Sequence, residues 1–195
     1  MKKRVILVGK SASGKDHARK ICQQWLELTY QISYTTRPPR WEETHGSDYY
    51  FIEKTEFEDM IKQDAWYEYI VFNDWYYGTT SEQFHTPNSF FVMTPAGLSH
   101  LTEKDRDESL VIYLDVNEEI RRNRMWERGG NADSVDRRLN ADTVDFLDFS
   151  NYDEKIEDHY YTILDIWLLV NKYIPTNTQL SVNSDGRLRI EKKVA

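Results

Sequence analysis

The sequence predicts a three-layer α/β fold with a central parallel sheet and a small, mostly antiparallel inserted lobe. Three observations predict it. An apolar run at residues 5–8 leads directly into a glycine-rich loop, as a buried strand does before a phosphate-binding turn. Strand and helix candidates alternate along most of the chain. A stretch crowded with aromatic residues, 37–86, interrupts that alternation and is predicted to form the lobe.

The first half of the chain is predicted to contain strands, one long helix and the inserted lobe. The predicted strands of the parallel sheet cover residues 5–8, 32–35, 90–93 and 110–114. A helix is predicted over 17–28, because Ile21, Trp25 and Leu28 lie on one helical face. Within the lobe we expect short strands in 48–52 and 67–77, and a helix over 55–62 with Thr55 as its N-cap.

The second half is predicted to be mainly helical. A charged helix over 117–128 ends at Gly129-Gly130, and a second helix begins near Ser134. Apolar residues at helical spacing predict an amphipathic helix over 153–173. The sequence leaves open whether this helix adds to the core or forms a homodimer surface. A last core strand is expected at 180–183, with a turn at Asp185-Gly186.

Length and composition limit the classes of protein. With 195 residues, the chain suffices for one domain with a sizeable core. The net charge of −8 argues against a nucleic-acid-binding surface, which would show a basic stripe. The single cysteine, Cys22, is expected to be a small buried side chain. The apolar run near the start is too short for a signal peptide or a membrane span, so we expect a cytoplasmic protein without a membrane partner.

The glycine-rich loop is the strongest chemical signal. Its position between a strand and a helix predicts that successive backbone N–H groups bind a phosphate. Lys15 would supply positive charge to the outer phosphates. Asp16 stands where a Ser or Thr hydroxyl usually reaches Mg²⁺, and a carboxylate can also bind that ion, directly or through water. The predicted phosphate-binding residues are Gly9, Lys10, Ser11, Ala12, Ser13, Gly14, Lys15 and Asp16.

A second cluster begins at Thr35. Arg37 and Arg40 lie three residues apart around two prolines, which stiffen the segment. A guanidinium fork suits bidentate phosphate binding. By themselves, these residues indicate either an anion site or a solvated basic turn.

Together these motifs resemble those of guanylate kinases. The glycine-rich loop, the segment from Thr35 to Phe51, Glu68 and the Tyr-Tyr-Gly-Thr segment 76–79 follow one another with nearly that family's spacing. The resemblance resumes around residues 124–139. It implies a P-loop kinase fold with a core of about 1–36 and 87–195, a lobe for the nucleoside monophosphate of about 37–86, and a lid of about 128–138.

The resemblance also implies individual roles. The acceptor phosphate would be held by Arg37, Arg40, Tyr49 and Tyr77. The guanine contacts fall on Ser33, Glu43, Glu68 and Thr79. Catalytic charge would come from Lys15, Arg124, Arg128 and Arg138, with Asn183 beside the donor adenine. A carboxylate at Glu68 would accept from both N1–H and N2–H₂ of guanine, which adenine cannot offer. Arg121 and Arg122 are expected to form a solvated face instead.

The leading hypothesis is ATP-dependent phosphorylation of GMP or dGMP, with Mg²⁺ arriving with ATP and these nucleotides as the partners. Ribose 1,5-bisphosphate phosphokinase, whose P-loop also shows Ser-Gly-Lys-Asp, is an alternative. Thr94 stands where guanylate kinases carry an aspartate, which leaves open a broader deoxynucleoside monophosphate kinase of the kind that large viruses encode. A non-catalytic phosphopeptide-binding module is disfavoured, because Gly9, Gly14 and Lys15 are all present.

Overall fold

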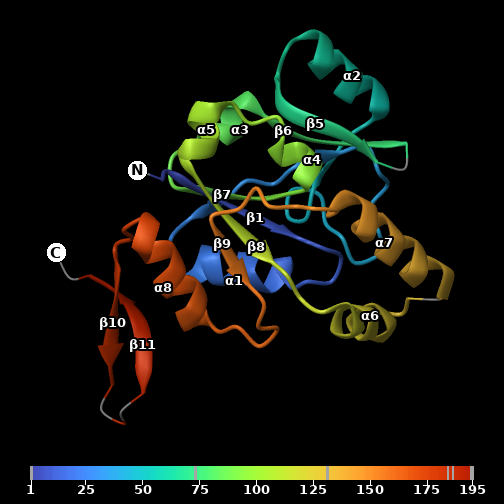
Figure 1. The fold of residues 1–195 in the computed structure, drawn as a ribbon. Helices are drawn as coiled ribbons and strands as arrows, with labels where there is room; N and C mark the ends of the chain where they lie inside the picture. Colours follow the sequence, from blue (N-terminus) through green and yellow to red (C-terminus); the bar gives the residue numbers. More distant parts are fainter. Residues whose placement is uncertain (1, 73, 131, 184, 186, 194–195) are drawn as a thin grey trace.

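The fold is built around one parallel sheet. The computed structural model describes residues 2–72, 74–130, 132–183, 185 and 187–193 (Figure 1). Five strands, all parallel, have the spatial order β2-β7-β1-β8-β9. They are β2 Thr29–Tyr30, β7 Ser89–Met93, β1 Arg4–Gly9, β8 Ser109–Leu114 and β9 Glu154–Ile156. Because β1 and β8 run in the same direction, Gly9 and Leu114 end at the same edge of the sheet.

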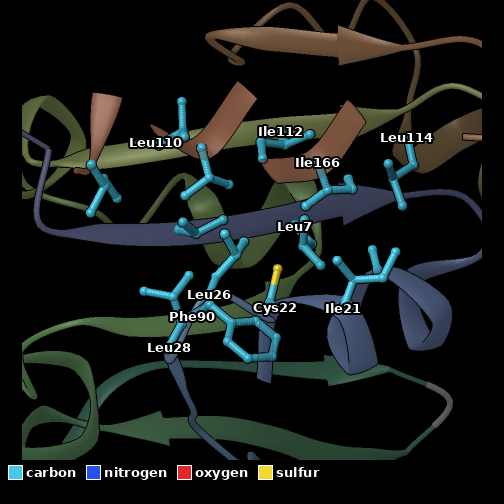
Figure 2. Close-up of a cluster of buried hydrophobic side chains, with 14 of the residues drawn as sticks. Leu7, Ile21, Cys22, Leu26, Leu28, Phe90, Leu110, Ile112, Leu114 and Ile166 are labelled. Carbon is cyan, nitrogen blue, oxygen red and sulfur yellow. The ribbon is translucent and has the colours of Figure 1, made fainter. Parts of the chain in front are cut away.

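Alternate residues of the central strands face opposite layers. On one face, Leu7 and Ile112 pack against Ile21 and Cys22 of α1 (Lys15–Trp25) and against Ile166 of α8 (Ile163–Tyr173), as Figure 2 shows. Cys22 is fully buried as expected, and burial raises the pKa of its thiol to about 12. The sheet is therefore closed on this side by two helices that contact each other.

The other face carries a second hydrophobic cluster. Ile6, Val8 and Phe91 pack there with residues of α3 (Ser81–Phe84) and α4 (Pro95–Leu98), and with the segment 146–152. α5 (Glu103–Asp107) precedes β8 on the same side (Figure 1). Two hydrophobic layers thus hold β1 rigidly in the centre, and the glycine-rich loop begins where β1 ends.

The lobe is a separate four-stranded sheet with the order β4-β3-β6-β5. Its strands are β4 Tyr50–Phe51, β3 Tyr34–Thr35, β6 Trp75–Thr80 and β5 Trp66–Phe72, and α2 (Lys54–Lys62) covers it. Only the short β3–β4 pair is parallel, so the sheet is mostly antiparallel, as predicted. Phe57 of α2 stacks between Trp66 and Tyr76, with ring centroids 3.9 and 4.8 Å away, and fixes the helix on the sheet.

Two predictions about the lobe boundary are wrong. Residues 32–35 were expected in the parallel sheet, but β3 belongs to the lobe, and β2 takes the core position. The Tyr30 ring packs 5.0 Å from that of Phe90, and the Gln31 N–H donates to the Phe90 carbonyl before the chain leaves the sheet. The N-cap of α2 is Glu53 rather than Thr55, and it caps through no side-chain hydrogen bond.

The single helix expected over 153–173 is also wrong. Asp153 bonds to Val111 through both its backbone and its carboxylate, which brings β9 onto the edge of the sheet beside β8. The helix starts only at α8, where Thr162 and Asp165 form a reciprocal cap. Since Ile166 and Val170 are fully buried, α8 contributes to the core.

The C-terminal strand differs from expectation in its partner. β10 (Thr178–Val182) pairs only with β11 (Leu188–Lys192), in a two-stranded sheet outside the core. Gly186 of the predicted turn lies outside the described residues. The helices α6 (Glu118–Glu127) and α7 (Ala132–Asp145) match the predicted charged helix and its successor. Within the described ranges, no helix is long and apolar enough to cross a membrane.

Candidate active site

The glycine-rich loop follows β1 at the carboxyl edge of the sheet, where ligands bind in open α/β sheets. A Cβ at Gly9 would lie 2.5 Å from Ser13 Oγ, so only glycine permits this tight loop. Gly14 has φ +102°, and a Cβ there would also lie 2.9 Å from the Tyr161 hydroxyl. Ala12, at φ 59°, adopts the left-handed conformation without being glycine. The loop therefore holds a strained backbone between its two glycines.

Lys15 folds back over this loop. Its Nζ donates to the carbonyls of Gly9 at 2.6 Å and Lys10 at 2.9 Å. Burial lowers the pKa of Lys15 to about 8, although the carboxylates of Asp142 and Asp16 partly oppose the shift. The ammonium therefore stays protonated at neutral pH and is poorly hydrated, which suits it to an anion.

The lobe contributes a cluster around two arginines. Glu43 Oε1 accepts from Arg37 at 2.8 Å and from Arg40 at 3.4 Å, and Glu43 Oε2 accepts from the Arg40 backbone N–H. The guanidinium of Arg37 lies 5.6 Å from the Tyr49 ring centroid. Tyr77 lies against Tyr49 and hydrogen-bonds Arg37. The structure thus brings all five of these predicted residues together, with Glu43 on the arginines.

Glu68 lies deeper in the lobe, opposite Thr79 in the β5–β6 register. Only 7% of Glu68 is exposed. Burial raises the pKa of its carboxyl group to about 7, although hydrogen bonds from Thr79 act to lower it. Gly97 leaves room for it, because a Cβ there would lie 3.1 Å from Glu68 Oε2 and 3.6 Å from Thr94 Oγ1. Tyr77, which bonds Arg37, and Thr79, which lies opposite Glu68, are on the same face of β6. Glu68 and the arginine cluster therefore lie on the same side of the lobe sheet.

A cavity of about 240 Å³ joins the loop to the lobe. Predicted residues from both parts line it: Ala12, Ser13, Gly14, Lys15, Asp16, Ser33, Arg40, Glu43, Tyr49 and Arg128. The carboxylate-bearing Asp16 is exposed in the first turn of α1. In the described part of the chain, no three His, Cys, Asp or Glu side chains are grouped to hold a metal ion by themselves. Asp16 could therefore bind Mg²⁺ only together with ligands such as phosphates or water.

Arginines from the lobe and from α6–α7 converge on this region. The pKa of Arg138 is lowered, first by partial loss of hydration, and then by the charges of Arg40, Arg137, Arg128 and Arg37. Like charges from separate elements repel one another unless an anion lies between them. The arrangement can therefore bind a multiply charged anion.

Arg124 and the segment after β9 hold the loop from another side. Arg124 donates to the carbonyls of Ala12 and His159, both at 3.1 Å. The Tyr161 hydroxyl donates to the Gly14 carbonyl at 2.8 Å. The segment 157–161 therefore lies beside the loop, a contact that sequence reasoning missed because it expected a helix there.

Asn183 does not reach the loop. It lies in the β10–β11 hairpin, where its Oδ1 accepts from the Arg187 N–H at 2.7 Å. Figure 1 shows this hairpin at the opposite end of the molecule from α6 and α7. Its short Val-Asn-Ser-Asp signal therefore reflects hairpin geometry.

Three further residues at this site were not predicted. Arg19 lines the cavity one helical turn after Lys15, a spacing that could have identified it. Asp142 bonds to Ser11, and Arg121 bonds to Asp142 at 2.7 Å. Arg121 was expected on a solvated face, yet only 3% of it is exposed, so that prediction is wrong. Arg122 does form ion pairs at the surface.

Comparisons with known proteins identify relatives. The guanylate kinase family model matches residues 1–88. A guanylate kinase of Nostoc sp. is 43% identical over 81 residues, 41% of either chain. One from Latilactobacillus sakei is 29% identical over 157 residues, 76% of this chain and 77% of the relative. The chain thus matches less than half the length of the Nostoc relative, and its similarity is strongest in the N-terminal part.

A solved structure supports the fold over most of the chain. The guanylate kinase from Anaplasma phagocytophilum superposes with a TM-score of 0.63, covering 89% of this chain and 88% of that one, at 22% sequence identity. The predicted P-loop kinase fold, with its parallel sheet and small second sheet, is therefore confirmed.

Burial of Glu68 makes a prediction about stability. Its folded pKa, about 7, exceeds the ordinary value of 4.5, so folding favours the protonated form. The stability due to that proton is present below pH 4.5 and is lost as the pH rises through 7. At pH 8 this cost is about 3 kcal/mol, so Glu68→Gln should raise Tm by about 6–12 °C there and by much less at pH 5.

Thermal denaturation of wild type and variant at several pH values measures this difference. Glu82→Gln, on the exposed start of α3, is the matched control and should give a Tm difference independent of pH. A Glu68→Gln difference that is equally flat would show that Glu68 is not forced toward its neutral form.

Proposed function

We propose, from the match of residues 1–88 to the guanylate kinase family model, that the protein transfers the γ-phosphoryl group of ATP to GMP or dGMP. The observation that carries this proposal is the cavity between the loop and the lobe. Cations of the loop, the lobe and the end of α6 line it, namely Lys15, Arg40 and Arg128. A buried carboxylate suited to reading guanine, Glu68, lies in the same lobe.

The parts of the chain would divide the work. Residues 37–86 together with β3 would form the acceptor lobe, and the rest of the chain would form the core that holds the donor. The lid is about 128–138, of which residue 131 lies outside the described residues. We place the donor phosphates on the glycine-rich loop, since its N–H groups and the start of α1 attract anions.

On the acceptor side, Arg37, Arg40, Tyr49 and Tyr77 would hold the phosphate of GMP. Glu43, already paired with both arginines, would keep them oriented instead of reading the base. Ionised Glu68 would accept from guanine N1–H and N2–H₂, with Thr79 and Ser33 completing the base contacts.

The reaction itself requires positioning and charge stabilisation. An oxygen of the GMP phosphate attacks the γ-phosphorus in line, the bond to the bridging oxygen breaks, and ADP leaves. Lys15, Arg124, Arg128 and Arg138 would stabilise the charge on the transferred group, and the lid would exclude water. Mg²⁺, when bound with ATP, neutralises phosphate charge. The exposed carboxylate of Asp16 is suited to hold it, since Mg²⁺ usually takes one or two carboxylates together with phosphates.

A coupled assay of ADP release tests the function. GMP, dGMP, dTMP, AMP and ribose 1,5-bisphosphate are compared as acceptors with ATP and Mg²⁺. Turnover should be highest with GMP or dGMP. Turnover with ribose 1,5-bisphosphate alone, or with no acceptor, would contradict the proposal, and similar rates with dTMP would indicate a broad deoxynucleotide kinase.

Replacing Lys15 tests the donor side. Lys15→Ala should lower kcat by about 100-fold or more, because the ammonium that stabilises the charge of the transferred group is lost. GMP binding, measured by calorimetry, should be nearly unchanged. Lys20→Ala, exposed on the same helix, is the control. A Lys15→Ala variant that keeps more than about a tenth of the wild-type kcat would count against this role.

Glu68→Gln should selectively impair guanine nucleotides. The amide presents a donor to guanine N–H groups and leaves a polar group unpaired, a loss of roughly 2–4 kcal/mol in kcat/KM. Steady-state kinetics with GMP and dTMP measure the selectivity. Equal losses with both acceptors would show that Glu68 does not read the base.

Asp16 makes a prediction about metal dependence. Asp16→Asn should raise the Mg²⁺ concentration needed for half-maximal rate more than it raises KM for GMP. Asp16→Ser should keep substantial activity, because a hydroxyl also reaches Mg²⁺. If Asp16 only favours the helix dipole, worth about 0.3–1 kcal/mol, the Mg²⁺ titrations of wild type and Asp16→Asn will superimpose.

A further inference from the structure

A buried ion pair between Arg121 and Asp142 binds the backbone of the glycine-rich loop. Both carboxylate oxygens of Asp142 lie 3.0 Å from the Ser11 backbone nitrogen, and the Ser11 hydroxyl donates to Oδ1 at 3.0 Å. Arg121 donates to Oδ2 at 2.7 Å and to the Ser11 carbonyl at 3.3 Å. Only 4% of the Arg121 side chain and 9% of the Asp142 side chain are exposed.

These contacts hold the loop at its most strained point. Ala12, the residue after Ser11, has φ 59°. Its own carbonyl is held by Arg124 at 3.1 Å. Arg121 and Arg124 of α6 therefore hold the carbonyls of both peptides that flank the left-handed residue, and Asp142 of α7 holds the N–H of the peptide before them. Such strain persists only where surrounding contacts hold it.

Asp142 also connects the loop to the lid. It follows Arg138 by four residues on α7, so the two side chains lie one turn apart on the same face of the helix. Arg138 faces the arginines of the acceptor lobe, whose charges act on it. Because Asp142 is fixed on the loop, Arg138 is held at a fixed distance from the loop, where the phosphates would bind.

We propose that Asp142 is a positioning residue for phosphoryl transfer, which holds the Ser11 peptide in place and keeps Arg138 aligned with the loop. This inference rests on the proposed function. Each oxygen of the carboxylate has a donor, Ser11 at Oδ1 and the buried Arg121 at Oδ2, and Arg121 in turn donates to the Val116 carbonyl at 3.0 Å. Asp142 therefore remains on the loop throughout the reaction and is not displaced by an incoming phosphate.

The decisive variant removes both charges together. In Arg121→Leu/Asp142→Ala no unpaired charge is left buried, so the fold is expected to survive. Arg122→Leu/Asp136→Ala is the matched control, because that pair joins the same two helices at 2.6 Å but has 39% and 57% of its side chains exposed. Asp142→Asn, which keeps the shape of the side chain, is the milder second variant.

The measurements are kcat, KM for ATP and GMP, and amide hydrogen exchange. In the Arg121/Asp142 double variant, kcat should fall by about 10-fold and KM for ATP should rise, while KM for GMP stays within about twofold. The Ser11 and Ala12 amides should exchange at least about 10-fold faster, with the amides of β1 unchanged. The control pair should change none of these values.

The outcomes separate the hypotheses. A double variant with the wild-type Tm, kcat and exchange rates would overturn the proposal. If it does not fold, Asp142→Asn decides, where a loss of about threefold or more in kcat is expected and an unchanged kcat overturns the proposal. If the wild type transfers no phosphoryl group, the proposed function fails, and faster exchange at Ser11 with weaker ATP binding would still support the positioning of the loop.

Discussion

The constraint on which this structure depends is the concentration of positive charge at one place in a chain with net charge −8. Lys15, Arg40 and Arg128 line one cavity, and Arg37 and Arg138 act on the same region. Mutual repulsion would scatter these side chains if each were free. Two acidic side chains oppose this, because Glu43 pairs with both lobe arginines, and the charge of Asp142 acts on Lys15. The site is thus held ready for an anion before any anion binds.

The rest of the fold serves to keep these groups at fixed distances. Two hydrophobic layers immobilise β1, so that the loop after Gly9 starts from a rigid strand. The lobe is a separate sheet fixed by its own aromatic stack, and it brings a second set of cations to the loop. The charges therefore come from independently packed elements, which can approach one another when a ligand neutralises them.

The sequence predicted well those features that depend on residues close together along the chain. The loop, the arginine cluster and the position of Glu68 follow from short motifs, whose residues the chain itself brings into proximity. The prediction failed where the structure depends on contacts between residues that are far apart in the sequence. Residues 154–156, expected in a helix, form β9 instead, because Asp153 before them bonds to Val111. Arg121 was expected at the surface and Asp142 was not predicted at all, since nothing local shows that two helices bury them against Ser11. Asn183 misled in the opposite sense, because a short motif matched without the surrounding fold.

Glu68 shows why such a site is not optimised for stability. Raising its pKa from 4.5 to about 7 corresponds to about 3 kcal/mol of unfavourable burial for the ionised form. A glutamine would avoid that penalty, yet it could not accept two hydrogen bonds from guanine with both oxygens. In the proposed function, guanine returns to the carboxylate the hydrogen bonds that burial removed, and a base without two adjacent donors returns fewer. The instability of the empty site and its preference for one base then have the same physical origin.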